Sequence, residues 1–377
     1  MSFTGTPSWK NGLTGDCAIT DKTGKCKRGA PSVLIVSLRY IGDVLVSTPL
    51  ALSLKTAYPD ATIDYLVFAG TDKAILKNPL IRNIITIPRK GASICLNLSF
   101  FRRYDIAVAA YPSDRTVIAA VVAGSRSIGL IYNSGKERWK RVALSEYSIC
   151  DDRFHVVSAM LSLASKLGIP AIPRAVMGYD RDDVAFARDA ISSDRYVLMH
   201  PYSMKHCKYW PAEHWGKLAA LIHDQIGCTA VFTATPAPDD KAYLDQILSF
   251  APRDAVTFPC NLNQFAAALK DCIAYVGIDT AATHIAAAIE APTIALYGPS
   301  LTRYWAPWPN GCEESSPFAA NKGIQRKGYI TVVQKEWDCV PCNMETCRIS
   351  TRDKMECLEA ITPEEVLREI ISVLKSC

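Results

Sequence analysis

Short apolar runs alternate with longer amphipathic segments through the first half of the chain. Residues 32–38 (SVLIVSL) form a run rich in β-branched side chains, which predicts a buried strand. In residues 43–58 apolar side chains recur at the spacing of one helix face, and Pro49 predicts a kink or the true start of that helix. The same patterns predict further strands at 61–68, 104–110 and 127–131, and a helix at 155–167.

A second alternating block follows. It contains predicted strands at 196–200, 229–233, 274–278 and 292–297, and predicted helices at 212–225, 264–272, 280–289 and 363–374. Strands separated by helices form parallel sheets, so we expect an α/β protein with two doubly wound, Rossmann-like domains that face a cleft. Pro170, Pro173 and the charged residues 180–183 place the linker in or near residues 170–194.

The composition is that of a globular protein, because 49% of the 377 residues are hydrophobic and 21% are charged. No run reaches the roughly 18 apolar residues of a membrane-spanning helix. Residues 1–31 are polar and lack the apolar region of a secretion signal, so we expect a polar tail and a cytoplasmic protein. The 14 cysteines are scattered, which favours packing thiols over a disulfide framework.

The net charge of +5 is mild, but basic residues cluster locally. They gather at 22–28, at Arg102 and Arg103, and at Lys136, Arg138, Lys140 and Arg141. These clusters are either solvated surface or a site of attraction for an anionic partner, such as a membrane or a phosphorylated acceptor. No nucleic-acid-binding motif accompanies the charge, so we expect no nucleic-acid partner.

The first segment that could carry chemistry is residues 39–43 (RYIGD), directly after the first predicted strand. Gly42 would let the backbone approach a ligand closely. Asp43 either caps a helix or acts as a functional carboxylate. The segment lacks the pattern G-x-G-x-x-G, which disfavours a dinucleotide-dependent dehydrogenase.

Two further segments follow strands of the second block. Residues 200–211 offer Ser203, Lys205, His206 and Lys208, whose cations either neutralise a diphosphate or lie on the surface. Residues 275–284 (YVGIDTAATH) run from a strand directly into a helix, and small residues at its start leave the first amides open to an anion. Asp279 suits sugar hydroxyls beside a diphosphate, or caps the helix, and His284 is otherwise a core histidine.

These segments together resemble glycosyltransferase family 9, the lipopolysaccharide heptosyltransferases. The resemblance rests on residues 39–49 with 57–60, on 208–215 and on 276–299, and extends in order from about residue 32 to the C-terminus. It implies a GT-B fold with the acceptor on residues 32–175 and the nucleotide sugar on residues 190–360. It also implies that the final helix, in 361–377, crosses back and packs towards the N-terminal domain.

The chemistry that the resemblance implies is an inverting, metal-independent displacement without a cofactor. A heptose would move from ADP-heptose onto a lipid-linked lipopolysaccharide core, at the inner face of the membrane. Asp43 corresponds to the base, Lys208 to the lysine that stabilises the departing diphosphate, and Asp279 to the residue that holds donor hydroxyls. Arg39 and Gly42 lie on the acceptor side, and the expected donor-binding set is Ser203, Asp279, Thr280, Ala281, Ala282, Thr283 and His284.

Two stretches depart from the family pattern and bear on the donor. Family members commonly carry glycine after the strand that ends near Phe232, whereas this chain has residues 233–236 (TATP), which leaves Asp239 or Asp240 for the donor ribose. Residues 204–206 also differ from the usual polar pattern.

A cysteine cluster near the C-terminus comprises Cys339, Cys342, Cys347 and Cys357. It could bind a structural zinc, but the spacing of the second pair is not that of a zinc knuckle, and packing thiols or a labile disulfide fit better. Three alternatives to a heptosyltransferase therefore stay open: the same fold with another nucleotide sugar or acceptor, a non-catalytic nucleotide-sugar binder, and a metal or redox module. The presence of both Asp43 and Lys208 argues against a decayed site.

Overall fold

The computed structural model describes residues 30–90, 100–350 and 355–375. The expected polar tail and the basic cluster at 22–28 therefore lie outside the described residues, except for the last two residues of that tail. Among the residues that are described, no helix is both long and apolar enough to cross a membrane.

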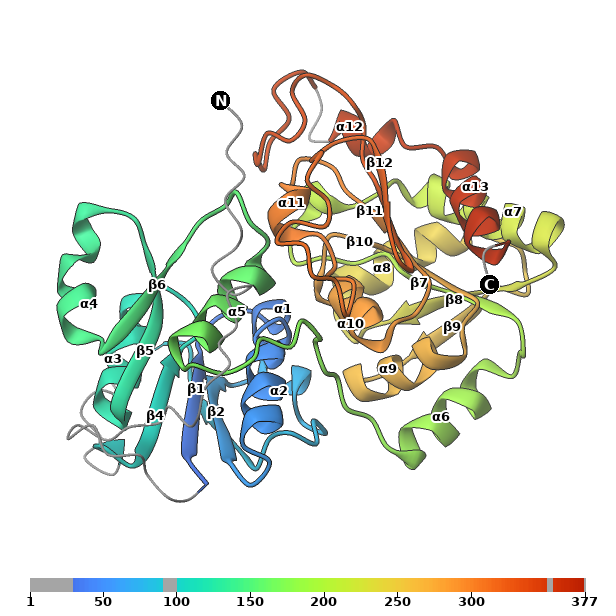
Figure 1. Cartoon of the computed structure of the whole chain (residues 1–377). Coiled ribbons are helices and arrows are strands. Elements are labelled where there is room, and N and C mark those ends of the chain that lie inside the picture. The colour runs from blue at the N-terminus through green and yellow to red at the C-terminus, as the bar shows by residue number, and fades with distance from the viewer. Residues whose placement is uncertain (1–29, 91–99, 351–354, 376–377) are drawn as a thin grey trace. The chain divides into compact units, whose positions relative to one another are not determined.

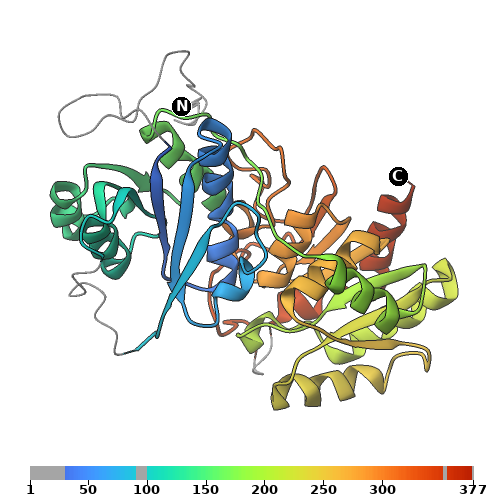
Figure 2. The same ribbon diagram turned by 90° about the horizontal axis from the view of Figure 1, so that it is seen from below.

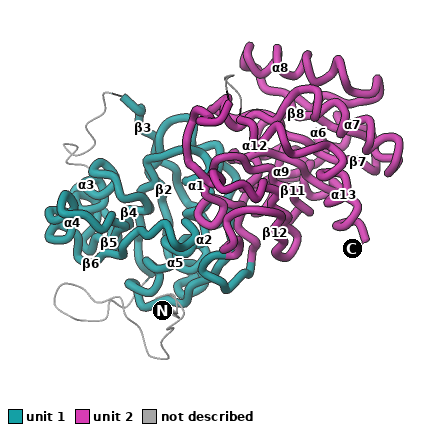
Figure 3. The backbone as a smooth tube through the Cα atoms, turned by 90° about the horizontal axis from the view of Figure 1, so that it is seen from above, with its two compact units in different colours: residues 1–176, 311–316 teal, residues 177–310, 317–377 magenta. Residues whose placement is uncertain are grey.

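The chain divides into two compact units (Figure 3). Unit 1 consists of residues 1–176 and 311–316, and unit 2 of residues 177–310 and 317–377. The division after Val176 falls inside the segment expected as the linker. The return of 311–316 to unit 1 was not expected, and it is fixed by the backbone N–H of His155, which donates to the carbonyl of Ser315 at 2.9 Å.

Unit 1 is built on a six-stranded, fully parallel sheet in the order β3-β2-β1-β4-β5-β6 (Figure 1, Figure 2). The order is that of a Rossmann sheet. Its elements along the chain are β1 (Ser32–Ser37), α1 (Ile41–Leu45), α2 (Thr48–Ala57), β2 (Thr62–Phe68), η2 (Asp72–Ala74), β3 (Asn83–Ile87), β4 (Tyr104–Ala109), α3 (Asp114–Ala123), β5 (Gly124–Tyr132), η5 (Gly135–Glu137), α4 (Arg138–Ala143), β6 (Glu146–Cys150) and α5 (Val156–Lys166).

The apolar runs predicted the inner strands of unit 1, and Pro49 does mark the start of a helix, because it lies in the first turn of α2. The edge strands β3 and β6 were not predicted. Both are short, half-exposed edge strands. The sequence of β6 has no apolar run, whereas β3 contains three isoleucines, a strand signal that sequence reasoning missed.

Unit 2 holds a seven-stranded sheet in the order β12-β13-β11-β10-β7-β8-β9, in which only β12 runs antiparallel to its neighbour. Its elements are α6 (Arg181–Ile191), β7 (Tyr196–His200), η6 (His206–Lys208), α7 (Ala212–Ile226), β8 (Thr229–Ala234), α8 (Pro238–Leu248), β9 (Val256–Pro259), α9 (Leu262–Asp271), β10 (Ala274–Ile278), α10 (Ala281–Ile289), β11 (Thr293–Leu296), α11 (Thr302–Trp305), β12 (Ile324–Lys327), β13 (Ile330–Val333), α12 (Glu356–Glu359) and α13 (Pro363–Leu374).

Helix α6 occupies residues 181–191 of the segment in or near which the linker is expected. Asp180 accepts the backbone N–H groups of Asp182 and Asp183 at 3.1 Å, and Asp183 in turn accepts that of Asp180 at 3.0 Å. The charged stretch that suggested a linker is therefore a helix cap. Helix α6 packs against α9, as part of unit 2.

Helix α13 has the predicted bounds, and its crossing back towards the N-terminal domain stays a prediction. Its buried residues Val366, Leu367 and Ile370 belong to the hydrophobic core of unit 2, and the helix lies against α7. Arg326 holds Glu369 with two hydrogen bonds of 2.9 and 2.7 Å. The apolar face of α13 thus completes the core of the unit to which it belongs.

Substitution Ile370→Ala is expected to lower the free energy of unfolding by about 2–5 kcal/mol, because a fully buried side chain leaves a cavity. Urea denaturation followed by circular dichroism measures this. Ile324→Ala, at a side chain 42% exposed on β12, is the matched control and should be near neutral. Equal, small effects of both substitutions would contradict the burial of α13.

Both sheets reverse their strand order beside their first strand. In unit 1, β1 lies between β2 and β4, and in unit 2, β7 lies between β8 and β10. Loops at the carboxyl ends diverge at such a switch point, and open α/β sheets bind their ligands there. Residues 39–43 follow β1, residues 201–208 follow β7, and Asp279 follows β10. Each of the three segments expected to carry chemistry therefore lies at a switch point.

Candidate functional site

Asp43 lies in the first turn of α1, directly after β1, and is 8% exposed. It is the third residue of the helix, and Tyr40 is the N-cap residue instead. The Oδ2 atom of Asp43 accepts the backbone N–H of Tyr40 at 3.3 Å and lies 4.0 Å from Nε of Arg39. Its Oδ1 atom is buried, and none of the residues that the structure describes hydrogen-bonds to it. One carboxylate oxygen is therefore held in place while the other is free to accept a proton.

Burial raises the pKa of Asp43 from 3.8 to about 6, because desolvation penalises the charged form. The charge of Arg39 and the N–H of Tyr40 lower this pKa, but they offset only part of the rise. A carboxylate with a pKa just below neutrality is mostly ionised at pH 7 and binds a proton more strongly than an ordinary one.

Arg39 stacks on two aromatic rings beside Asp43. Its guanidinium carbon lies 4.6 Å from the centre of the Tyr111 ring and 4.9 Å from that of Tyr40. Tyr111 follows β4, the neighbour of β1, so the contact joins the loops on both sides of the switch point. The structure thus brings the predicted Arg39 to the predicted Asp43.

Two more arginines lie at the carboxyl ends of strands of the same sheet, after β3 and β4. Arg89, just after β3, lies 4.9 Å from the Tyr40 ring and 5.3 Å from the Phe68 ring. Arg115, in the first turn of α3, lies 5.2 Å from the Phe68 ring and donates to the carbonyl of Arg89 at 2.8 Å. Sequence reasoning missed both arginines, although each follows a strand of this sheet. Together they make this edge of unit 1 strongly positive.

In unit 2, Lys208 and Asp279 form an ion pair with 2.6 Å between Nζ and Oδ2. The side chains are 23% and 11% exposed, so neither is an ordinary surface charge. Ser300, which follows β11, donates its hydroxyl to the same carboxylate oxygen at 2.5 Å. Both Lys208 and Asp279 were predicted singly, but their pairing and the part of Ser300 were not.

The N-terminus of α10 has no side-chain cap, and Thr280 is its N-cap residue in extended backbone. Ala281 and Ala282 are the first two helical residues, whose amides have no partner within the helix. Such a helix end suits an anion. The hydroxyl of Thr283 donates instead to the carbonyl of Ile278 at 2.5 Å and is fully buried, and its backbone N–H donates to the carbonyl of Thr280 at 3.2 Å. Both donor groups of Thr283 are therefore used within the protein, unlike the amides of Ala281 and Ala282.

His284 lies near this ion pair, on α10. It is 9% exposed, and its buried Nδ1 atom has no hydrogen-bond partner within the described parts of the chain. Burial lowers its pKa to about 4, Asp279 opposes this, and Lys208 adds to it. His284 is therefore neutral at pH 7 and can exchange hydrogen bonds with a ligand without adding charge.

A buried glutamine that was not predicted holds the loop after β11 with two hydrogen bonds. Gln334, just after β13, donates to the carbonyls of Gly298 at 2.7 Å and Ser300 at 2.9 Å. A Cβ atom on Gly298 would lie 2.7 Å from the side chain of Leu358. Packing thus explains why glycine stands at this position.

The remaining donor-side candidates are more loosely defined. Ser203 is half-buried after β7, and its hydroxyl accepts the backbone N–H of Lys205 at 3.4 Å. Asp240 accepts from the hydroxyls of Tyr209 at 3.1 Å and Thr235 at 2.5 Å. Of the two carboxylates considered for the ribose, Asp239 is the exposed one.

The four cysteines differ in exposure. Cys339 and Cys342 are exposed, Cys347 is half-buried and Cys357 is buried. Burial raises the pKa of Cys357 to about 12, and the other three thiols add to the rise. Within the described part of the chain, no group of three or more His, Cys, Asp or Glu is placed to hold a metal ion. The zinc alternative therefore gains no support.

One of the basic clusters needs correction. Lys140 is 2% exposed, and its Nζ pairs with Asp114 at 2.9 Å and with Glu137 at 2.8 Å. It also donates to the carbonyl of Pro112 at 2.8 Å. Lys140 is thus a buried link between α3 and α4 rather than a surface charge, because three oxygens replace its water.

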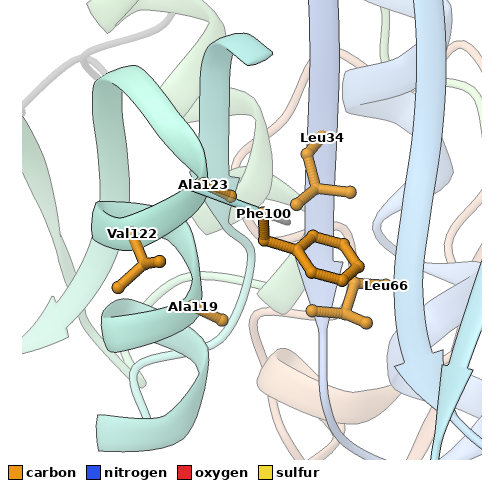
Figure 4. Close-up of a pocket in the computed structure, with 6 residues that line it drawn as sticks. All are labelled: Leu34, Leu66, Phe100, Ala119, Val122 and Ala123. Carbon is orange, nitrogen blue, oxygen red and sulfur yellow. The ribbon is translucent and has the colours of Figure 1, made fainter. Parts of the chain in front are cut away.

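Figure 4 shows a small apolar pocket between α3 and the sheet of unit 1, with the ring of Phe100 beside Leu34 and Leu66. Every lining side chain is apolar, the others being Ala119, Val122 and Ala123. A packing gap without polar groups has nothing to orient a sugar or a phosphate, so this pocket is not the candidate site.

The family model for glycosyltransferase family 9 (heptosyltransferase) matches residues 104–327, which is more than half of the chain. Lipopolysaccharide heptosyltransferase 3 of Escherichia coli K12 is 29% identical over 292 residues, covering 72% of this chain and 83% of that protein. Lipooligosaccharide heptosyltransferase 2 of Haemophilus influenzae is 23% identical over 345 residues, covering 79% of this chain and 93% of that protein.

Two solved structures share the fold. The glycosyl transferase family 9 structure from Veillonella parvula matches with a TM-score of 0.73 at 19% identity, over 92% of this chain and 98% of that one. The ADP-heptose lps heptosyltransferase II of E. coli matches with a TM-score of 0.69 at 21% identity, over 92% and 99%. The chain therefore belongs to glycosyltransferase family 9, the heptosyltransferase family, and is a glycosyltransferase of the GT-B fold.

Proposed function

We propose that this enzyme transfers a heptose from ADP-heptose to a hydroxyl of a lipid-linked lipopolysaccharide core. Two considerations support the donor and the acceptor. The relatives named above are a lipopolysaccharide and a lipooligosaccharide heptosyltransferase, and the E. coli structural neighbour is an ADP-heptose lps heptosyltransferase. The enzyme would meet such an acceptor at the inner face of the membrane.

The observation that carries the proposal is the state of Asp43. It is buried at a switch point, one oxygen is free, and its pKa is raised to about 6. The acceptor oxygen attacks the anomeric carbon while Asp43 takes its proton, and the bond to the diphosphate breaks on the opposite side, which inverts the configuration. Because the family model begins at residue 104, the role of Asp43 rests on its geometry and on the sequence resemblance.

Unit 2 would supply the groups for the donor. Lys208 is neutralised by Asp279, and a diphosphate would be a second anion that can share its charge. The open amides of α10 would add hydrogen bonds to the same phosphates. Asp279 would then accept sugar hydroxyls. Both a cation and oriented amides stabilise the charge that develops on the leaving group.

The proposed acceptor side, in unit 1, is positively charged. Arg39, Arg89 and Arg115 concentrate positive charge beside Asp43. Aromatic rings beneath the guanidinium groups orient them for anions. An acceptor that carries phosphate or carboxylate groups fits this edge better than a neutral glycan.

Nucleotide release tests the proposal. Purified protein is incubated with ADP-heptose or with UDP-hexoses, with and without a heptose-deficient core, and in the presence of a chelator. Acceptor-dependent ADP release that survives the chelator supports the proposal. Release from a UDP-sugar alone would replace the donor and keep the fold, and tight donor binding without release from any donor would favour a non-catalytic binder.

The pH dependence of kcat/KM should follow the ionisation of Asp43. The base must be unprotonated, so activity is expected to rise about tenfold per pH unit below a pKa of about 6 and to level off above it. The affinity for ADP, measured over the same range, separates this effect from titration of the nucleotide. A rate that is flat from pH 5 to 7 would exclude Asp43 as the base.

A further inference from the structure

Helix α4 lies at the edge of unit 1 (Figure 1), and the side chains on its outward face are unusual. Lys140 points inward, and at about 100° per residue Arg138 and Val142 lie on the opposite side of the helix. Trp139 and Arg141 occupy the two flanks. Val142 is 88% exposed and Trp139 is 39% exposed. We call Lys136, Arg138, Trp139, Arg141 and Val142 the α4 surface.

The α4 surface is positively charged as well as apolar. The segment 133–145 contains one acidic residue, Glu137, which is buried and paired with Lys140. Asp114, the exposed carboxylate next to α4, is paired with the same lysine. Lys140, on the inner side of α4, therefore neutralises both carboxylates, and the charges of Lys136 and Arg138 face solvent.

A lone exposed aliphatic side chain needs no explanation. Here an almost fully exposed valine and a tryptophan share a short helix with arginines. This is the composition of helices that lie in a bilayer interface, where aliphatic groups enter the acyl region, tryptophan lies at headgroup depth and basic groups meet lipid phosphates. The charge and the shape both fit an anionic lipid surface.

The position of the α4 surface relates it to Asp43 within unit 1. Tyr132 ends β5 directly before this segment, and its hydroxyl lies 3.3 Å from that of Tyr111. Tyr111 in turn lies under Arg39, which neighbours Asp43. The segment that bears α4 thus begins at the same carboxyl edge of the sheet as the candidate base.

We propose that the α4 surface docks unit 1 onto an anionic lipid bilayer, with the carboxyl edge of its sheet towards the headgroups. Docking would raise the local concentration of a lipid-linked acceptor at Asp43. The inference rests on the proposed function only for this benefit, because lipid binding itself requires no turnover.

Vesicle co-sedimentation tests the docking, with vesicles of phosphatidylethanolamine and phosphatidylglycerol compared with phosphatidylcholine alone. Wild type should bind the anionic vesicles, and the double variant Trp139→Ala/Val142→Asp should lose at least about tenfold in partitioning. Lys136→Glu/Arg138→Glu should lose about fivefold or more per residue, in a salt-dependent way. Ile324→Asp, at an exposed apolar side chain of β12, is the control and should bind like wild type.

Two further readouts separate docking from catalysis. Brominated lipids should quench the tryptophan fluorescence of the wild type. The quenched component should be missing in Trp139→Phe, because it comes from Trp139. Turnover of a soluble, deacylated acceptor should be unchanged in the α4 variants, which shows that they fold. Vesicle binding by the α4 variants equal to that of wild type would overturn the inference, as would absence of lipid binding by wild type. Dissociation of an oligomer by Val142→Asp without an effect on vesicles would assign the surface to a second copy instead.

Discussion

Asp43→Asn is expected to lower kcat by about 10²–10⁴-fold while the affinity for the donor stays unchanged. The amide keeps the size of the side chain and its acceptor for the Tyr40 N–H, but it cannot take a proton from the acceptor hydroxyl. Donor binding is assigned to unit 2 and so should not depend on this position. Single-turnover ADP release together with calorimetric titration of ADP measures both quantities.

The same substitution should not destabilise the protein at neutral pH. A raised carboxyl pKa means that the folded state holds the proton more tightly than the unfolded chain, so stability falls as pH rises from about 4 to about 6. The change from 3.8 to about 6 corresponds to at most about 3 kcal/mol at pH 7. Asp43→Asn removes this cost, and its melting temperature at pH 7 should equal or exceed that of wild type.

These two results check each other. Loss of activity with retained stability and donor affinity identifies Asp43 as the base. A variant that is inactive because it unfolds would show a lower melting temperature, which the pKa argument does not allow. Full activity of Asp43→Asn would exclude a single-displacement mechanism in which Asp43 is the base.

Lys208→Ala is expected to lower kcat by about 10²–10³-fold and to weaken ADP binding. The substitution removes the cation that meets the developing charge of the diphosphate. It also leaves Asp279 buried with Ser300 as its remaining partner, which opposes the approach of a second anion. Rapid-quench kinetics and ADP titration test these effects.

Two further substitutions are compared with Lys208→Ala. They are Asp279→Asn and Lys217→Ala, of which the second breaks the exposed ion pair with Glu213. Asn at position 279 releases Lys208 from its ion pair, so ADP should bind at least as tightly as to wild type while the sugar portion loses its acceptor. Lys217→Ala breaks an ion pair whose side chains are 55% and 53% exposed, so activity should be unchanged. Equal losses for Lys208→Ala and Lys217→Ala would show that Lys208 does not contact the diphosphate.

Local sequence patterns were sufficient to predict the structural features that depend on a single segment of the chain. The run at residues 32–38 predicts a buried strand, and the stretch 275–284 joins strand to helix without a spacer, so Asp43, Lys208 and Asp279 were each predicted to follow a strand. The parallel strands of one sheet place their carboxyl ends at one edge, which is why segments that follow such strands in each predicted domain are candidates for ligand binding.

The sequence by itself therefore determined the α/β class, the inner strands of unit 1 and the residues at the switch points, because these depend on spacing over a few residues. The caps considered at Asp43 and Asp279 were wrong, because Tyr40 and Thr280 are the N-cap residues. Only the tertiary structure decided which side chains meet. The pairing of Lys208 with Asp279, the stacking of Arg89 and Arg115 on rings from other strands, the burial of Lys140 and the packing of α13 on α7 all join segments far apart in the chain. Desolvation likewise sets the pKa of Asp43, and burial is a property of the packed chain that no local pattern contains.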